Sequence, residues 1–497
     1  MHVPRIGRSM TDLETAADPI PETTSTIAAT RRLKPVPHPS RQERAATGKA
    51  VRKKLSLTQL ADLSTDDRPR ALTLLQSQDA SRVPDLVPIR YGRMSASNFT
   101  FFRGGALVMA SDLAANANSG LTVQLCGDAH INNFGIYASP ERRLVFDIND
   151  FDETHAGPFE WDVKRMAASV AIAAQLNGFT KKQTRDAASA SALGYREAMR
   201  TLAANGNLAI WYSHLDAEEI LTTVRQTLDA RRMTTASSVL QKARTKDSIQ
   251  AVSKLAELVD GQLRFVSQPP LVRPIEDFQD SDVVEATYSY IRTMIRGYRS
   301  TLQWDRRHLL EQFRLVHMAR KVVGVGSVGT RSWLLLFEGV DGGDPLVLQA
   351  KEAQDSVLER FAGKSRFKHQ GQRVVHGQQF MQATSDIFLG WQSSRGLDDV
   401  EHDFYIRQLR DGKGSIDPVG MLPDGLALYG RICGETLARA HARSGDRIAI
   451  ASYLGARTKF EDAITEYALK YADVNASDYA TLTAAIARGE ITAIKDL

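Results

Sequence analysis

Cysteine is nearly absent from this 497-residue chain, which contains only Cys126 and Cys433. Two residues so far apart support neither a disulfide framework nor a thiolate zinc site. Long apolar runs are also missing: no stretch approaches the roughly 20 residues needed to cross a bilayer, and the N-terminus lacks the apolar core of a signal peptide. We therefore expect a cytoplasmic protein in a reducing compartment, with no membrane span.

Three common enzyme signatures are missing as well. No His-Glu-x-x-His sequence occurs, so a helix-borne zinc site is not indicated. A Gly-x-Ser-x-Gly nucleophile elbow around Ser327 would need glycine where Val325 stands. A P-loop ending at Gly363-Lys364-Ser365 would need glycine where Leu358 stands. These absences argue against a zinc protease, a serine hydrolase and a P-loop nucleotidase.

The composition is that of an ordinary globular protein. Hydrophobic residues make up 43% of the chain and charged residues 24%, with 63 Lys and Arg against 58 Asp and Glu. The length exceeds the roughly 250–300 residues that one hydrophobic core usually organises. We therefore expect at least two lobes.

Positive charge is concentrated near the N-terminus. Residues 31–54 hold nine Lys and Arg against Glu43 alone, and the segment contains three prolines and no apolar period. This pattern predicts a flexible basic arm that could contact nucleic acid or an acidic surface. A solvated leader with no dedicated partner is the simpler interpretation, and composition favours it.

Helix-rich and strand-rich stretches alternate along the rest of the chain. A nearly all-helical block is expected from Trp161 to about Arg314, and a small antiparallel set of strands before it. The expected helices are 163–176, 182–203, 217–231, 237–259, 283–302, 426–443 and 460–471. The expected strands are 121–126, 134–137, 143–148, 315–323, 333–339, 346–350, 386–391 and 404–409.

Two acidic loops follow strands in the first set. The loop 127–133 presents Asp128 and Asn133, and the strand 144–148, which we expect to pair beside the first loop's strand, delivers Asp150. A single Asp in such a place is more often a turn residue. An Asp and an Asn five residues apart, followed by a hairpin and a second Asp, match the layout of phosphoryl-transfer sites that bind Mg²⁺.

These motifs resemble those of the aminoglycoside and choline phosphotransferase branch of the kinase-like superfamily. The similar runs are Gly127-Asp128-x-His130-x-x-Asn133, Asp150-Phe151-Asp152, Gly157-Pro158 and Trp161-Asp162-Val163. The resemblance implies that Asp128 is the catalytic Asp, that Asn133 and Asp150 are metal ligands, and that Asp162 supports the catalytic loop. Cys126 departs from the family pattern, which has His there.

A glycine loop and a lysine that resemble those of a kinase nucleotide site come later in the chain. Gly324, Gly326, Ser327 and Gly329 form a loop between two strands, whereas a dinucleotide-binding loop would open a helix. Lys351 ends the next strand, in a run similar to the third-strand lysine motif of kinases. We expect this site to bind ATP, with Glu359 as the acidic partner of Lys351.

The order of these motifs reverses that of ordinary kinases, which implies circular permutation. Leu437-Ala438-x-x-His441-Ala442 resembles the helix that precedes the catalytic loop in the phosphotransferase branch. We therefore predict a two-lobed, circularly permuted, kinase-like α+β fold with a helix-rich large lobe and a small antiparallel sheet lobe. The expected parts are 1–87, basic arm and lead-in; 88–178, catalytic and metal loops; 179–312, helical part; 313–415, nucleotide-binding lobe; and 416–497, C-terminal helices.

Across most of its length the chain also resembles a bacterial domain-of-unknown-function family, number 2252. The distinctive runs are 88–94, 102–104 and 440–446, and they include Arg90, Arg93 and Arg103, which could bind phosphate or form core ion pairs.

The prediction is an Mg²⁺- and ATP-dependent phosphotransferase that acts on an unidentified hydroxyl or amine acceptor, small molecule or protein. The alternatives are a protein AMP-transferase on the same fold, a non-catalytic nucleotide sensor, and a dinucleotide oxidoreductase. The last requires a helix after Gly329.

Overall fold

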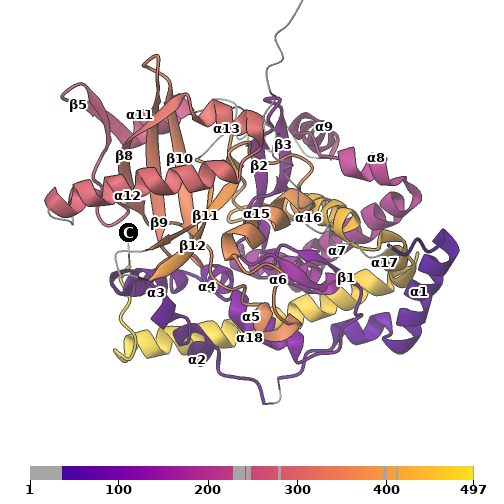
Figure 1. The fold of residues 1–497 in the computed structure, drawn as a ribbon. Helices are drawn as coiled ribbons and strands as arrows, with labels where there is room; N and C mark the ends of the chain where they lie inside the picture. Colours follow the sequence, from indigo (N-terminus) through magenta and orange to yellow (C-terminus); the bar gives the residue numbers. More distant parts are fainter. Residues whose placement is uncertain are drawn as a thin grey trace, which may run out of the picture. The chain divides into compact units, whose positions relative to one another are not determined.

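The computed structural model describes residues 36–65, 67–227, 241, 248–277, 281–395, 400–409 and 412–495. The chain divides into residues 1–40 and residues 41–497. Every element below belongs to the second unit, which is mixed α+β (Figure 1). No described helix is both long and apolar enough to span a bilayer.

An antiparallel sheet of six strands, drawn in pink and orange in Figure 1, forms one part of this unit. Its strand order is β11-β12-β10-β9-β8-β7. The strands are β7 (Val272–Pro274), β8 (Phe313–Lys321), β9 (Ser332–Gly339), β10 (Pro345–Glu352), β11 (Gly390–Arg395) and β12 (Glu401–Gln408). The five strands β8 to β12 overlap the expected strands, although β11 begins four residues later than 386.

The two faces of this sheet are covered by different helices. Side chains alternate between the faces of a strand, so Leu335 and Phe337 of β9 pack with Tyr298 of α12 (Ser281–Ser300). Leu334 and Leu336 pack on the opposite face, with Val252 and Leu255 of α11 (Ser248–Leu255). This alternation fixes which face of β10 and β12 can carry polar groups.

Helices form the larger apolar core. They are α6 (Phe159–Leu176), α7 (Lys181–Ala204), α16 (Pro423–Ser444), α17 (Arg447–Leu454) and α18 (Lys459–Ala487). Helices α7 and α16 approach closely because glycines face the contact: a Cβ at Gly434 would lie 2.1 Å from the carbonyl oxygen of Ser191. The expected helices 163–176, 182–203, 426–443 and 460–471 all lie within these elements.

Smaller helices complete the layout. Residues 71–114 contain α2 (Ala71–Gln76), α3 (Val87–Met94), α4 (Asn98–Gly104) and α5 (Ala106–Ala114). Helix α8 (Asn207–Tyr212) follows α7, and the helices near the site and the sheet are α9 (Ala217–Thr227), α13 (Trp304–Leu310), α14 (Glu359–Ala362) and α15 (Gln370–Met381). Helix α15 follows the lysine-bearing strand β10 and precedes β11.

The strands around the two acidic loops pair differently from our expectation. We expected 144–148 beside the strand that leads into the first loop. Instead β1 (Thr122–Leu125) pairs with β4 (His155–Pro158), while β3 (Leu144–Ile148) pairs with β2 (Phe134–Ala138) and β2 with β13 (Gly414–Ser415). The short turn between β2 and β3 makes them a hairpin. The loop 127–133 therefore joins two separate sheets.

The block 161–314 is also less helical than expected. One helix was predicted over residues 237–259. Within that range, residues 237–240 and 242–247 lie outside the described part, and the helix α11 ends at Leu255, before the predicted end. The hairpin β5 (Ala256–Val259) and β6 (Gln262–Phe265) follows, and then β7, which joins the six-stranded sheet. Asp260 and Gly261 turn this hairpin in left-handed conformations that no helix accommodates.

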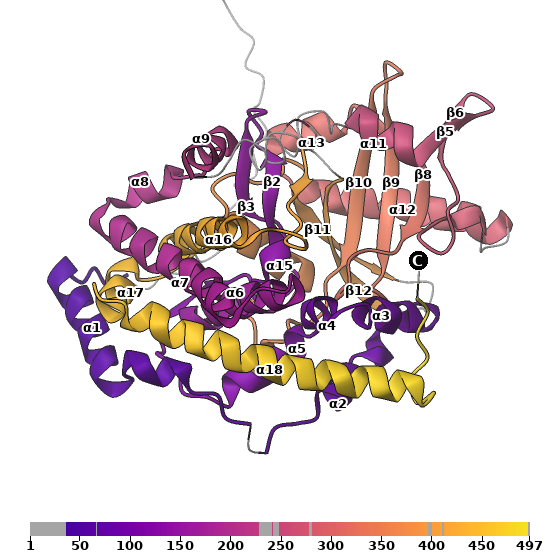
Figure 2. The same ribbon diagram turned by 180° about the vertical axis from the view of Figure 1, so that it is seen from behind.

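The basic arm is in part a helix. Residues 41–54 form α1 (Arg41–Lys54), which packs on α17, as Figure 2 shows. A Cβ at Gly48 would lie 2.0 Å from the carbonyl oxygen of Ala449, so glycine allows the two helices to approach closely. This close contact forms although α1 has no apolar stripe. The expectation of a flexible arm is wrong for residues 41–54, and residues 31–35 lie outside the described part.

Candidate functional site

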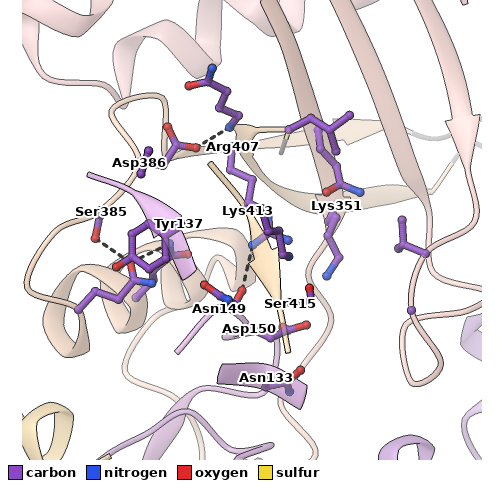
Figure 3. Close-up of a pocket in the computed structure, with 18 of the residues that line it drawn as sticks. Asn133, Tyr137, Asn149, Asp150, Lys351, Ser385, Asp386, Arg407, Lys413 and Ser415 are labelled. Atoms are coloured by element: carbon purple, nitrogen blue, oxygen red, sulfur yellow. Dashed lines mark hydrogen bonds between the residues drawn. The ribbon is translucent and has the colours of Figure 1, made fainter. Parts of the chain in front are cut away.

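A cavity of about 730 Å³ lies between the six-stranded sheet and the β2–β3 hairpin. Asn133 and Asp150 line it from the hairpin side, and Gly324, Ser327 and Lys351 line it from the sheet side. Figure 3 shows Lys351 reaching from β10 toward Asp150, with Asn133 beyond it. The structure therefore brings these five predicted site residues to one cavity. Four others, Asp128, Gly326, Gly329 and Glu359, are not among the residues that line it.

The start of loop 127–133 is held by a buried carboxylate. Asp162 accepts hydrogen bonds from the backbone N–H of Cys126 at 2.8 Å and of Gly127 at 3.1 Å. His441 of α16 lies with Nε2 3.3 Å from Asp162 Oδ2, and the Tyr195 hydroxyl is 2.9 Å from His441 Nδ1. Asp162 therefore supports this loop, and α16 lies beside it although 279 residues separate His441 from Asp162 in sequence.

Asp128 is partly buried beside two arginines. Arg165 Nε donates to Asp128 Oδ1 at 2.7 Å, and the positive charge of Arg103 also acts on this carboxylate. Burial raises the pKa of Asp128, and Arg165 opposes that rise. The side-chain amide of Asn133 donates from Nδ2 to the carbonyl oxygen of Asp128 at 2.8 Å. This contact leaves Oδ1 of Asn133 as the atom that can ligate a cation.

Asp150 lies next to Asn133 because the two loops are hydrogen-bonded. The backbone N–H of Asn149 donates to the carbonyl oxygen of Asn133 at 2.8 Å. Burial and the charge of Asp152 both raise the pKa of Asp150. Among the described residues no group of three or more His, Cys, Asp or Glu could hold a metal ion. One amide and one carboxylate suit Mg²⁺, which keeps several water and phosphate ligands.

The acidic partner of Lys351 is Asp152 and not Glu359. Lys351 Nζ lies 2.6 Å from Asp152 Oδ2, and the Tyr405 hydroxyl donates to Asp152 Oδ1 at 2.6 Å. Lys351 and Tyr405 are cross-strand partners of β10 and β12, so their side chains share a face. Glu359 lies on α14, where its charge acts on His155. This role of Asp152 was not predicted from the sequence, although the residue stands in the acidic turn after β3.

This ion pair has clear electrostatic effects. Burial alone would raise the pKa of Asp152, but the charge of Lys351 and the hydrogen bonds from Lys351 and Tyr405 hold it below its usual value. Burial would lower the pKa of Lys351, and Asp152 outweighs this and raises it. Both groups are therefore charged at neutral pH. Glu352, next to Lys351, points to the other face and contacts Arg331 and His402.

The glycine loop connects the antiparallel strands β8 and β9, and no helix follows Gly329. Gly324 and Gly329 have φ of +64° and +94°, a region that favours glycine. Two arginines hold the loop by its carbonyl oxygens: Arg93 donates to Gly324 at 2.6 Å, and Arg82 donates to Gly326 at 3.0 Å. Ser327 Oγ donates to Asp152 Oδ2 at 3.1 Å, which ties the loop to the acidic turn.

The cavity wall is strongly cationic. Among the described residues that line it, the acids are Asp150 and Asp386. The cations are Lys351 and six more, namely Arg103, Arg142, Lys254, Lys321, Arg407 and Lys413. Burial, followed by the charge of Arg407, lowers the pKa of Lys413 to about 7. Such a wall favours an anionic ligand.

Most of these cations were missed from sequence. Arg407 could have been found beside the predicted Lys351, because residues 349, 351, 405 and 407 fall on one face of β10 and β12. Lys254, Lys321, Arg142 and Lys413 come from four distant segments that only the fold brings together. Of the three arginines singled out earlier, Arg103 lines the cavity, whereas Arg90 is fully buried and pairs with Asp79 at 3.0 Å.

Fold and site together define a mixed α+β protein with a cationic cavity between a six-stranded antiparallel sheet and a loop-bearing hairpin. Residues 82–485 match the profile of a bacterial family described as "Uncharacterized protein conserved in bacteria (DUF2252)". Since this match covers most of the chain, the protein belongs to that family. No curated protein and no solved structure matches the chain.

Proposed function

We propose that the cavity is the active site of a kinase-like phosphotransferase that uses Mg²⁺ and ATP and acts on a hydroxyl or amine acceptor. The observation that carries the proposal is the single cavity lined by Lys351, Gly324 and Ser327 on one side and by Asn133 and Asp150 on the other. A glycine loop, a strand lysine and an Asp–Asn pair are the parts that phosphoryl transfer requires around one nucleotide. Because ATP is a cytoplasmic metabolite, the proposal includes a cytoplasmic location.

The order of the sheet supports a kinase-like small lobe. The glycine loop joins β8 to β9, the lysine lies on β10, and α15 is inserted between β10 and β11, beside β12. Helix α16 packs beside the loop 127–133, where the resemblance expects the helix that precedes the catalytic loop. In this account the kinase-like parts are complete in space but permuted in sequence.

Each residue has a distinct role in the proposed reaction. Asn133 Oδ1 and the Asp150 carboxylate would hold Mg²⁺, which when bound would neutralise charge on the phosphates. Lys351, fixed by Asp152 and Tyr405, would bind phosphate oxygens, as would the backbone of the glycine loop. Asp128, held by Arg165, would orient the acceptor and take its proton.

Measurement of product distinguishes this proposal from its alternatives. The purified protein is incubated with Mg²⁺, ATP labelled at the γ-phosphate and a fractionated bacterial extract, and the fractions and the protein itself are examined by mass spectrometry. Phosphoryl transfer supports the proposal, and adenylyl transfer to a protein identifies an AMP-transferase. Binding of ATP without any product indicates a sensor.

Matched variants connect the product to the site. Asp128→Ala should abolish turnover and leave nucleotide binding intact, because removing a catalytic group from a preorganised site costs about 10²–10³ in rate. Asp355→Asn alters an exposed acid outside the cavity and serves as the control. If Asp128→Ala and Asp150→Ala both retain full activity, the assignment is wrong.

A further inference from the structure

A second feature, separate from the cavity and independent of the proposed function, lies at the end of residues 41–497 that carries α1, α17 and α8 (Figure 2). A groove of about 590 Å³ runs along α1 there, against the C-terminal end of α7 and against α17. Arg41, Lys49, Arg52 and Arg200 line it, and none of the described residues that line it is acidic.

The cations of α1 face the groove for a geometric reason. Arg41, Ala45, Lys49 and Arg52 recur at intervals of three or four residues, so they lie on one side of the helix. The adjacent side, centred on Gly48, packs against α17. Arg41 and Arg52 also donate to the backbone carbonyl oxygens of Ala203 and Ser452, which fixes the helix with its basic side along the groove.

An exposed apolar stripe lies next to the groove. Leu208, Trp211 and Tyr212 of α8 are 69%, 47% and 70% exposed, and their spacing puts them on one face of that helix. Ile210 is buried on the other side and anchors α8 to the core. Arg443 lies over the Trp211 ring, with Cζ 4.1 Å from its centroid.

Hydrogen bonds connect the groove to the segment that leads into α8. Arg41 Nη2 donates to the carbonyl oxygen of Ala203 at 2.8 Å, and Arg447 Nη2 donates to that of Asn205 at 2.9 Å. Ala203 lies at the C-terminal end of α7, and Asn205 lies in the short connection from α7 to α8. Arg41 of α1 and Arg447 of α17 thus hold the end of α7 and the connection that leads into α8, which places the start of α8 beside the groove.

We infer that this surface docks the protein on an anionic lipid bilayer. Trp and Tyr beside an aliphatic residue suit the boundary between headgroups and acyl chains, and nearby Lys and Arg suit anionic headgroups. A nucleic acid would also attract the cations and stack on aromatic rings. It would leave Leu208 exposed without a partner, whereas a bilayer buries all three apolar side chains.

Co-sedimentation of the full-length protein with vesicles tests this inference. Vesicles of phosphatidylcholine with phosphatidylglycerol should pull the protein down at low salt, whereas phosphatidylcholine alone should not. Raised salt should weaken the binding, because exposed charges are screened. Absence of binding to the anionic vesicles overturns the inference.

Paired variants then assign binding to the two parts of the surface. Lys49→Glu/Arg200→Glu should weaken vesicle binding by about fivefold or more for each cation changed. Leu208→Ser/Tyr212→Ser should also weaken it, and because these side chains are exposed, unfolding temperature should not change. The matched controls are Lys181→Glu, at the far end of α7, and Val340→Ser, in the turn between β9 and β10, both of which are exposed.

Two further results would also overturn the inference. One is vesicle binding that both paired variants retain at wild-type strength. The other is tighter binding of an RNA or DNA duplex than of vesicles, together with a difference between the two paired variants. In that case the Lys49→Glu/Arg200→Glu variant loses binding to the duplex, and the Leu208→Ser/Tyr212→Ser variant keeps it. That result would make the surface a nucleic-acid site.

Discussion

Lys351 and Asp152 form a buried ion pair, with Nζ 2.6 Å from Oδ2, that connects the six-stranded sheet to the acidic turn after β3. Tyr405 and Ser327 donate to the same carboxylate. One side chain therefore positions groups from β10, β12 and the glycine loop. If Lys351 binds phosphate, Asp152 sets where its ammonium group lies.

Removal of either partner should destabilise the protein. Asp152→Asn leaves the buried Lys351 ammonium without its paired carboxylate, and Lys351→Met leaves Asp152 with hydrogen bonds from neutral donors only. We expect each change to lower the free energy of unfolding by about 2–4 kcal/mol, measured by urea denaturation at neutral pH. The double variant should lose less than the sum of the two. Additive losses would mean that the ion pair is not a coupled unit.

We expect Asp150 to contribute to nucleotide binding through Mg²⁺. Asp150→Asn keeps the shape of the side chain and removes its charge, so we expect the affinity for Mg²⁺ and ATP together to fall about tenfold or more, and the affinity for ATP without Mg²⁺ to fall little. Calorimetric titration measures both. A fall of the same size with and without Mg²⁺ would exclude Asp150 as a metal ligand.

The lowered pKa of Lys413 predicts a pH dependence of nucleotide affinity. Since burial and Arg407 lower this pKa to about 7, Lys413 gains its positive charge as the pH falls through neutrality. Affinity for ATP should therefore rise between pH 8 and pH 6 by up to about tenfold, because the protonated fraction of free Lys413 rises from about a tenth to about nine tenths over that interval. Lys413→Met should flatten this profile, and an unchanged slope in the variant would assign the titration to another group.

The raised pKa of Glu153 predicts that the stability of the protein depends on pH. Burial raises its pKa to about 7 from an ordinary value of 4.5, although Val357 donates its backbone N–H to Glu153 Oε2 at 2.7 Å. The folded protein thus binds a proton more tightly than the unfolded chain, and the resulting stability is present at pH 4.5 and lost as the pH rises through 7.

Unfolding in urea at several pH values measures this effect. The wild type should lose about 1–3 kcal/mol between pH 5 and pH 8 relative to Glu153→Gln, which carries no titrating group at this position. Parallel curves for the two proteins would contradict the prediction.

The sequence predicted the local elements of the site better than their connections. The loop 127–133, the strand before Asp150, the glycine loop and the strand that ends at Lys351 follow from short apolar runs broken by Gly, Asp and Asn. Pairing of β1 with β4 rather than with β3 depends on contacts between distant segments, which a local pattern does not contain. The same limit hid the pair of Lys351 with Asp152, 199 residues away.

The positions that charged side chains take in the fold were the hardest property to predict from the sequence. The basic segment 31–54 was expected to be flexible, yet Gly48 lets residues 41–54 pack as a helix with no apolar stripe. Conversely, Lys254, Lys321 and Lys413 look like ordinary surface lysines in the sequence, and the fold gathers them at one cavity. Tertiary contacts decided both outcomes.

The proposed function requires the sheet and the hairpin to bind one nucleotide between them. A crystal structure of the protein grown with Mn²⁺ and a non-hydrolysable ATP analogue tests it most directly, because Mn²⁺ gives an anomalous signal at Mg²⁺ sites. We expect the anomalous peak against Asn133 Oδ1 and the Asp150 carboxylate, with the phosphates between that peak and Lys351. A nucleotide bound at another surface, or a metal peak away from Asp150, would contradict the account.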